Sequence, residues 1–230
     1  APDQFFTHEC PDLFKMGDWW YLVFSEFSDR KQTRYRMARN PHGPWTTPAD
    51  DALDTRAWYA AKSASDGRRR FFFGWLATRD GEKDDGGYQW GGNLVVHEVV
   101  QRPDGTLAAH IPDTVTAAFN TPQPLSLTPI LGPWQEGSGS ITTEAGGRNS
   151  TAILGKMPEE CLIEATITVD AGTVAAGLLL RASDDTDTHY EVRLEPARQR
   201  VVVDRWPRPG DQAFIDERPL AIEVGKPIHL

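Results

Sequence analysis

Residues 8–24 read His-Glu-Cys-Pro-Asp-Leu-Phe-Lys-Met-Gly-Asp-Trp-Trp-Tyr-Leu-Val-Phe, and the fold assignment starts from this stretch. The Gly-Asp pair at 17–18 is a turn signal, and the aromatic and branched apolar run at 19–24 is typical of a buried β-strand. A carboxylate, a thiol and a proline stand together at 9–11, just ahead of the turn. The stretch predicts a strand after the turn and no obvious strand before it.

Beyond this stretch, short runs rich in β-branched and aromatic residues recur between turn signals formed by Gly, Pro, Asp and Ser, while helical periodicity is hard to find. The spacing of roughly ten to twenty residues suits an antiparallel meander, the unit of a propeller blade. We therefore predict an all-β chain. The further strands predicted in the N-terminal half of the chain are 35–38, 58–62, 71–76 and 94–100.

The composition changes around residues 119–133, where clustered prolines exclude a central strand or a helix. We predict propeller blades over 1–118, a linker over 119–128 and an incomplete β-sandwich over 129–230. The runs beyond the linker alternate apolar with polar residues, as strands with one wet face do. These runs are 161–169, 175–181, 190–194 and 200–204.

Charge and composition exclude several classes of protein. The formal net charge of -9 and the lack of a basic stripe argue against a nucleic-acid partner. No apolar run approaches the length that crosses a bilayer, so we expect no membrane partner. Cys10 and Cys161 offer no disulfide framework, and no cluster with metal-ligand spacing is present, so we expect no metal and no cofactor. Eight Trp residues suggest platforms for sugar rings.

The sequence Glu9-Cys10-Pro11-Asp12, ahead of a turn and a hydrophobic strand, resembles the acid/base motif of glycoside hydrolase family 32, the invertases, levanases and inulinases. In those enzymes the matching Glu is the general acid, so the resemblance implies this role for Glu9. Alternatively, Glu9 could be an exposed acidic residue of a turn, without a catalytic role. For Asp12 we expect a hydrogen bond that supports the turn rather than a contact with substrate.

Four further segments match the family in the expected order. Asp54, ahead of 58–62, looks like the family's Asp that contacts the sugar, although it could instead cap a turn. Trp75 ends a strand that begins with an Arg, and in the family the matching Trp lies near the sugar pocket. Alternatively, Trp75 could pack in the core. The remaining matches are 90–94 with 104–107, which resemble the last blade, and 204–205, which resemble a strand of the C-terminal sandwich.

Two departures from the family pattern stand out. The family's Pro-Arg-Glu is replaced here by Val96-His97-Glu98, so the substrate preference could differ from that of the common invertases. His97 could line the site or be a structural histidine. The nucleophile motif Asn-Asp-Pro-Asn-Gly and the Arg-Asp-Pro motif are both absent. We therefore expect the N-terminal blades and the nucleophile to lie outside this chain.

The chemistry requires a protonated carboxyl. Retaining glycosidases use two carboxyl groups about 5 to 5.5 Å apart, one attacking the anomeric carbon and one protonating the leaving oxygen. Glu9 fills the second role, and Cys10 with the Pro11 ring would give it an apolar flank that favours the protonated form. Asp54, Trp75, Cys10 and His97 are the predicted substrate-binding residues.

The resemblance implies part of a five-bladed β-propeller followed by a concanavalin-like sandwich, and a hydrolase that cleaves β-fructofuranosyl linkages in sucrose or fructans with retention and without a cofactor. The sequence does not fix the localisation, for which we favour secretion. Two alternatives stay open. One is a related propeller glycosidase acting on arabinosides or xylosides, because a fold does not fix the substrate. The other is a carbohydrate-binding protein that has lost catalysis.

Overall fold

The computed structural model describes residues 5–28, 30–83, 85–144, 146–208 and 216–230. Over these residues the only helices are the short α1 (Asp113–Thr116) and the 3-10 turns η1 (Asp80–Glu82) and η2 (Pro196–Arg198). None of these helices has the length or the apolar character that a membrane span needs. All other elements are strands, which confirms the prediction of an all-β chain.

The chain divides into two compact units. The first unit combines residues 1–113 with 164–230, and the second is formed by 114–163. The described strands form six open antiparallel sheets, and none of these closes on itself. The assignment of these sheets to propeller blades and a sandwich stays a prediction.

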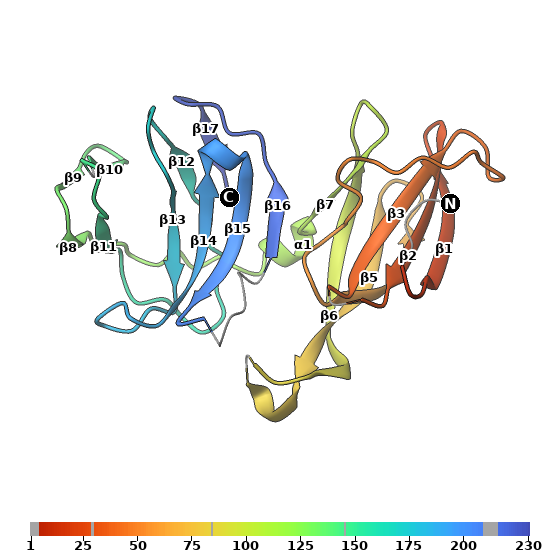
Figure 1. Ribbon diagram of the computed structural model, residues 1–230, viewed down its shortest axis with the longest axis horizontal. Helices are drawn as coiled ribbons and strands as arrows, with labels where there is room; N and C mark the ends of the chain where they lie inside the picture. Colours follow the sequence, from red (N-terminus) through yellow and green to blue (C-terminus); the bar gives the residue numbers. More distant parts are fainter. Residues whose placement is uncertain (1–4, 29, 84, 145, 209–215) are drawn as a thin grey trace. The chain divides into compact units, whose positions relative to one another are not determined.

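The first sheet contains β1 (Glu9–Met16), β2 (Trp19–Glu26) and β3 (Gln32–Ala38), and Figure 1 shows these strands side by side. The turn at 17–18 joins β1 to β2, as predicted. The expectation that no strand precedes this turn was wrong. Pro11 and a register shift between Glu9 and Asp12 disguise β1, because proline removes a ladder donor and a bulge breaks the period of two.

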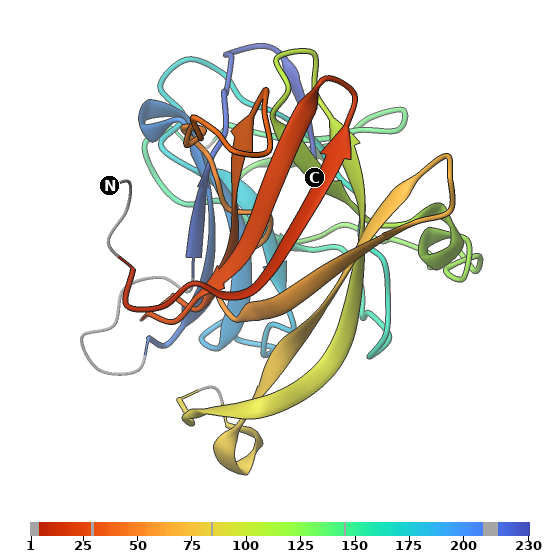
Figure 2. The same ribbon diagram turned by 90° about the vertical axis from the view of Figure 1, so that its right-hand side faces the viewer.

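The second sheet contains β4 (Trp58–Ser65), β5 (Arg70–Arg79), β6 (Tyr88–Gln101) and β7 (Leu107–His110), in that order. Each predicted strand of this region is present, and β5 and β6 run further than the apolar pattern indicated. Their outer halves, with η1 between them, form a hairpin arm that projects beyond the rest of the sheet in both views (Figures 1 and 2).

The core of these two sheets is aromatic. Trp58, Tyr21, Tyr35 and Phe72 are fully buried, and the Phe72 ring meets Trp58 edge-on with centroids 6.4 Å apart. Gly74 lies against the indole of Trp58, where an added Cβ would come within 2.6 Å of a ring carbon. The close approach of β5 to β4 therefore depends on a residue without a side chain.

The third sheet follows the order β13 (Ala176–Leu180), β14 (His189–Glu195), β15 (Arg200–Trp206) and β16 (Asp216–Pro219). The first three of these strands match the predicted alternating runs, whereas β16 was not predicted. Leu194, for example, packs on a small apolar core between the charged Arg193 and Glu195. A separate pair joins β12 (Thr166–Thr168) to β17 (Pro227–His229).

The predicted strand at 161–169 was too long, because β12 covers only Thr166–Thr168. Its partner β17 is three residues long and starts at Pro227, which has no N–H to continue the ladder.

The second unit holds two small hairpin-like sheets. In one, β8 (Thr128–Leu131) pairs with β11 (Thr151–Ile153), and in the other β9 (Trp134–Glu136) pairs with β10 (Ile141–Thr143). Pro129 lies in β8, which among the described strands pairs with β11 alone, and an edge position is where a sheet tolerates proline.

Within the first unit, β16 lies against the loop that precedes β4. The carboxylate of Asp216, 4% exposed, accepts hydrogen bonds from the Arg56 backbone N–H at 2.6 Å and from Gln32 at 3.3 Å. Arg218 donates to the Asp50 carboxylate and to the Asp54 carbonyl, each at 2.8 Å. These contacts join the third sheet to the first two.

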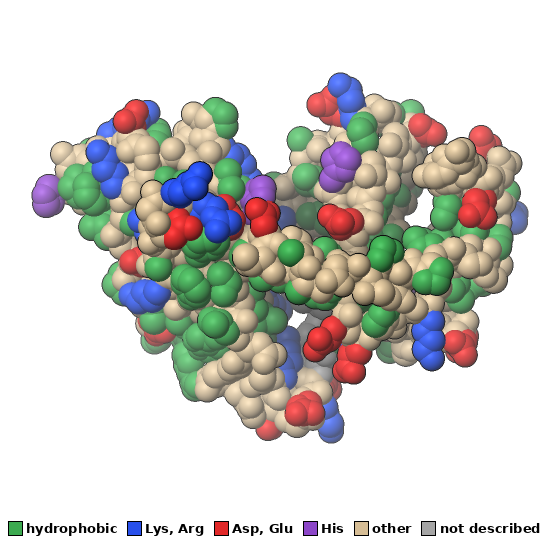
Figure 3. Space-filling view, turned by 180° about the vertical axis from the view of Figure 1, so that it is seen from behind, with side chains coloured by type: hydrophobic (Ala, Val, Ile, Leu, Met, Phe, Trp, Pro, Cys, Tyr) green, Lys and Arg blue, Asp and Glu red, His purple; other side chains and the backbone are tan. Residues whose placement is uncertain are grey.

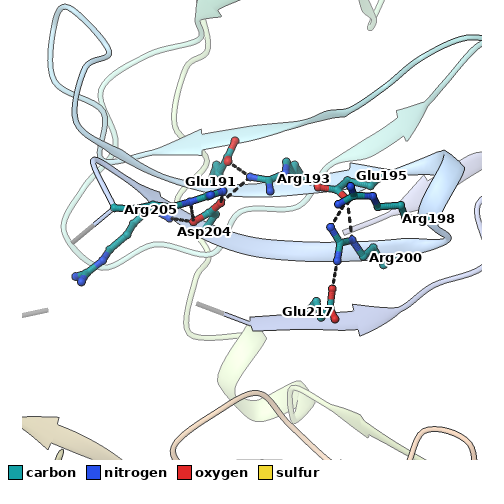
Figure 4. Close-up of polar contacts among 9 residues, drawn as sticks. Glu191, Arg193, Glu195, Arg198, Arg200, Asp204, Arg205 and Glu217 are labelled. Atoms are coloured by element: carbon teal, nitrogen blue, oxygen red, sulfur yellow. Dashed lines mark hydrogen bonds and ion pairs between the residues drawn. The ribbon is translucent and has the colours of Figure 1, made fainter. Parts of the chain in front are cut away.

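A network of charged side chains crosses the third sheet (Figure 4). Arg193 pairs with Glu191, Glu195 and the buried Asp204, and Arg200 bridges Glu195 and Glu217. Burial alone would raise the pKa of Asp204, but hydrogen bonds from Arg208, Arg193 and the Arg205 amide lower it below the usual value. The Asp204-Arg205 segment singled out in the sequence is therefore the anchor of this network.

Replacing Asp204 with Asn should lower the free energy of unfolding at neutral pH by about 3 kcal/mol, because Arg193 loses a buried anionic partner. A depressed carboxyl pKa stabilises the fold above the unfolded value of about 3.9 and loses this effect as the pH falls through the folded value. The difference between the variant and the wild type should therefore be full above about pH 4 and shrink below it.

Urea unfolding followed by circular dichroism from pH 7 to pH 3 measures this difference. The control is Glu223→Gln, because Glu223 is 75% exposed and its pairing with Lys226 should be worth less than about 0.5 kcal/mol. Equal destabilisation by both variants, or a difference that grows in acid, would contradict the role assigned to Asp204.

Candidate functional site

The site begins where β1 and β4, which belong to different sheets, lie next to each other. Glu9 is half-buried at the start of β1, and the hydroxyl of Tyr59 in β4 donates to its Oε2 at 2.7 Å. Tyr59 is 2% exposed, so this hydrogen bond is shielded from water on the tyrosine side. The contact joins two residues fifty positions apart in the sequence.

Irregular backbone in both strands places these two side chains. Cys10 has φ of 50° and Ala60 has φ of 56°, and the ladder register shifts at each of these points. Ser25 is the cross-strand partner of Glu9, and its Oγ accepts the Ala60 N–H at 2.8 Å. Non-glycine residues in this backbone region are uncommon, and such strain concentrates at functional positions.

Two more contacts hold β1 against β4. The Lys62 ammonium donates to the Pro11 carbonyl at 2.6 Å, and the Ser63 N–H donates to the Asp12 carboxylate at 2.8 Å. The expectation that Asp12 supports the turn by a local bond was wrong, since this carboxylate instead joins the two sheets. The Glu9-Cys10-Pro11-Asp12 motif is thus fixed at both ends.

Electrostatics keeps the Tyr59 phenol neutral. Burial raises its pKa above the usual value, and the hydrogen bond to Glu9 and the negative charge of that carboxylate raise it further. Cys10 and the fully buried Glu26 add smaller effects in the same direction. Tyr59 is therefore a permanent hydrogen-bond donor at working pH. Because its hydroxyl takes Oε2 of Glu9, the other carboxyl oxygen is left to carry and deliver a proton.

Trp75 adds an aromatic wall. Its ring meets that of Tyr59 edge-on, with centroids 5.7 Å apart, and Trp75 stays partly exposed in β5. The structure therefore brings together three of the predicted site residues, namely Glu9, its neighbour Cys10 and Trp75. Cys10 and Cys161 are both free thiols, as the sequence indicated.

Asp54 and His97 lie elsewhere. They pair with each other, with Oδ2 and Nε2 2.6 Å apart, and the His97 ring packs on Trp58 with centroids separated by 4.8 Å. Asp54 also lines a shallow pocket together with Arg102 and Leu107. The structure thus supplies a structural partner for each of these residues, and their contact with substrate stays a prediction.

Tyr59 lies in the segment 58–62 that resembles the family, but the sequence predicted no role for it. The available signal was a tyrosine, which carries a hydroxyl, next to Trp58 in a predicted strand. Among the described residues, no cluster of His, Cys, Asp or Glu is arranged to hold a metal ion. The chemistry that the site can perform is proton transfer by a half-buried carboxyl beside an aromatic surface.

The Glu9→Gln substitution should lower the pKa of Tyr59 towards the usual value without reaching it, because the negative charge is removed while burial remains. Tyrosine Cζ chemical shifts in ¹³C NMR, assigned with Tyr59→Phe, follow this titration. Glu98→Gln is the control, since Glu98 pairs with Arg69 instead. Identical Tyr59 midpoints in the wild type and Glu9→Gln would mean that the contact is absent in solution.

No protein-family model and no curated protein sequence matches the chain. Two solved structures resemble it in fold. An exo-inulinase from Aspergillus awamori aligns with a TM-score of 0.54 at 14% identity, over 93% of this chain and 45% of that chain. A family 32 β-fructofuranosidase from Bombyx mori aligns with a TM-score of 0.51 at 16% identity, over 86% of this chain and 40% of that chain.

The chain thus spans less than half the length of either structure. At these identities the likeness is one of backbone arrangement. The backbone of this chain follows a path similar to that of part of each of the two glycoside hydrolases. Because a fold does not fix an activity, the chemistry must be argued from the side chains of the site.

Proposed function

We propose that this chain is part of a glycoside hydrolase that cleaves β-fructofuranosyl linkages in sucrose or fructans with retention, and that Glu9 is its general acid and base. The observation that carries the proposal is the hydrogen bond from Tyr59 to Oε2 of Glu9 beside Trp75. It fixes a half-buried carboxyl next to an aromatic ring. The Glu-Cys-Pro-Asp motif and the fold likeness to an inulinase and a β-fructofuranosidase support the same reading.

In the first step, the protonated oxygen of Glu9 gives its proton to the leaving glycosidic oxygen while a second carboxylate attacks the anomeric carbon. In the second step, Glu9 takes a proton from water, and the water oxygen displaces the enzyme carboxylate. Tyr59 orients Glu9 through both steps because its phenol stays neutral. Trp75 offers an apolar face to the sugar ring.

The attacking carboxylate is proposed to come from residues outside 1–230, because the family's nucleophile motif does not occur in this sequence. In the same proposal, residues 1–118 form blades of a five-bladed propeller, 119–128 a linker and 129–230 part of a sandwich. Asp54 and His97, which pair with each other, are proposed to contribute to substrate binding through the polar atoms that this pair leaves available.

Glu9→Gln in the whole protein should lower kcat/KM for sucrose or inulin by about 10²- to 10⁴-fold, the usual contribution of a general acid. A fructoside with a nitrophenolate leaving group should lose far less, because that group departs without a proton. The basic limb of the pH–rate profile should disappear with the acid. Glu136→Gln, an exposed carboxylate in the second unit, is the matched control.

Equal losses for both leaving groups, or an unchanged basic limb, would contradict the role of Glu9. Product analysis on sucrose, inulin, levan and arabinan then fixes the sugar. Cleavage of arabinan alone would replace the fructosidase proposal by an arabinosidase. Sugar binding that survives Glu9→Gln, with no turnover by the wild-type protein, would identify a binding protein without catalysis.

A further inference from the structure

Trp90 has no role in the function proposed above. It lies in β6 on the hairpin arm and is 68% exposed. Hydrophobic side chains gather on the rear surface of this part of the molecule, as Figure 3 shows. A single exposed apolar side chain needs no explanation, so the case for Trp90 rests on its neighbours.

Trp90 belongs to the same aromatic cluster as the candidate site. Its ring meets those of Tyr59 and Trp75 edge-on, with both pairs of centroids 6.1 Å apart. Tyr59 in turn donates its hydroxyl hydrogen to Glu9. Trp90 therefore contacts the residue that binds the proposed acid, and the three rings form a compact triangle in which each ring touches the other two.

The indole also contacts a second set of side chains. Phe27, just after β2, stacks on it nearly parallel, with centroids 5.6 Å apart and an interplanar angle of 15°. The Lys31 ammonium lies 5.3 Å from the Trp90 centroid, 5.2 Å from that of Phe27 and 5.1 Å from that of Tyr88. The cation places N–H donors beside the rings, and the cation–π contacts hold them together.

The backbone next to Trp90 is specialised. Gly91 has φ of 129°, and a Cβ added to Gly92 would lie 1.8 Å from the Leu76 carbonyl oxygen. Both positions therefore require glycine, the first for its conformation and the second for the close approach of β5. These two glycines fix the backbone next to Trp90, and this backbone limits the directions in which its side chain can point.

We propose that Trp90, with Lys31 beside it, is a stacking subsite for a sugar unit further along the chain from the bond that Glu9 protonates. The inference rests on the proposed glycosidase function and makes the preferred substrate an oligosaccharide or polymer rather than a disaccharide. An exposed indole face stacks on the apolar face of a pyranose or furanose ring, and the ammonium beside it donates to ring hydroxyls. The Tyr59 ring, which touches Trp90 and binds Glu9 through its hydroxyl, places this platform next to the candidate acid, where a neighbouring sugar unit would lie.

The test is equilibrium binding to the Glu9→Gln protein, which avoids turnover, by isothermal titration calorimetry. The ligands are sucrose and inulin-type tri-, tetra- and pentasaccharides, with the arabino-oligosaccharides of equal length as a second series. In the Glu9→Gln protein, which retains Trp90, the affinity should rise about tenfold between the disaccharide and the longer oligomers of one series. Adding Trp90→Ala should remove this rise and leave disaccharide binding unchanged, while Trp90→Phe should keep most of it.

Leu94→Ala is the matched control, since Leu94 lies in the same strand and is also 68% exposed. If Trp90→Ala weakens all lengths by one factor, or Leu94→Ala acts equally, Trp90 supports the fold of the arm and the subsite proposal is wrong. If the long oligomers bind with the affinity of the disaccharide before any change at Trp90, the subsite is also wrong. If neither series binds at any length, the glycosidase proposal itself fails together with the subsite.

Discussion

The candidate site depends on the packing of two sheets around the Trp58 indole. Trp58 is fully buried, Phe72 packs edge-on against it, and Gly74 leaves room for the ring. Buried interiors are dense enough that a change of one methylene is felt by the neighbours. A displacement of β4 by less than an ångström would lengthen the hydrogen bond of Tyr59, the next residue, to Glu9. The core therefore sets the precision of the site.

Several buried carboxylates of the first unit differ from Glu9 in the groups that donate hydrogen bonds to them. Asp51, Asp204 and Asp216 are buried and take hydrogen bonds from arginines or backbone amides, so they hold elements together. Glu9 takes its hydrogen bond from a neutral phenol instead. A guanidinium would hold the carboxyl in its charged form, whereas a phenol orients it and still allows it to carry a proton. This difference, more than burial, separates the candidate catalytic carboxyl from the structural ones.

Apolar runs between turn signals predicted the positions of β2 to β6 and β13 to β15, because buried strands leave a local pattern. β1 was missed because Pro11 and the bulge at Cys10 break that pattern, and the pairing that makes it a strand comes from β2. The 161–169 strand was overestimated because its length is limited by the short partner β17. Local sequence carries no information about the length of a distant partner.

The site shows the same limit. Glu9 and Trp75 could be named from their motifs, but the Tyr59 contact spans fifty residues and the Asp54–His97 pair forty-three. Such pairs arise from the packing of separate sheets, which a single sequence does not encode in any local period. Trp90 likewise looked like a blade residue until its ring contacts with Tyr59 and Trp75 placed it beside the site.

The most direct measurement of the central claim is a crystal structure of the whole protein as the Glu9→Gln variant with an uncleaved oligosaccharide. The account predicts that the side-chain amide of residue 9 lies within hydrogen-bond reach, about 3 Å, of a glycosidic oxygen and still contacts the Tyr59 hydroxyl. A sugar bound with its glycosidic oxygens beyond the reach of that side chain, even through one water, would contradict it.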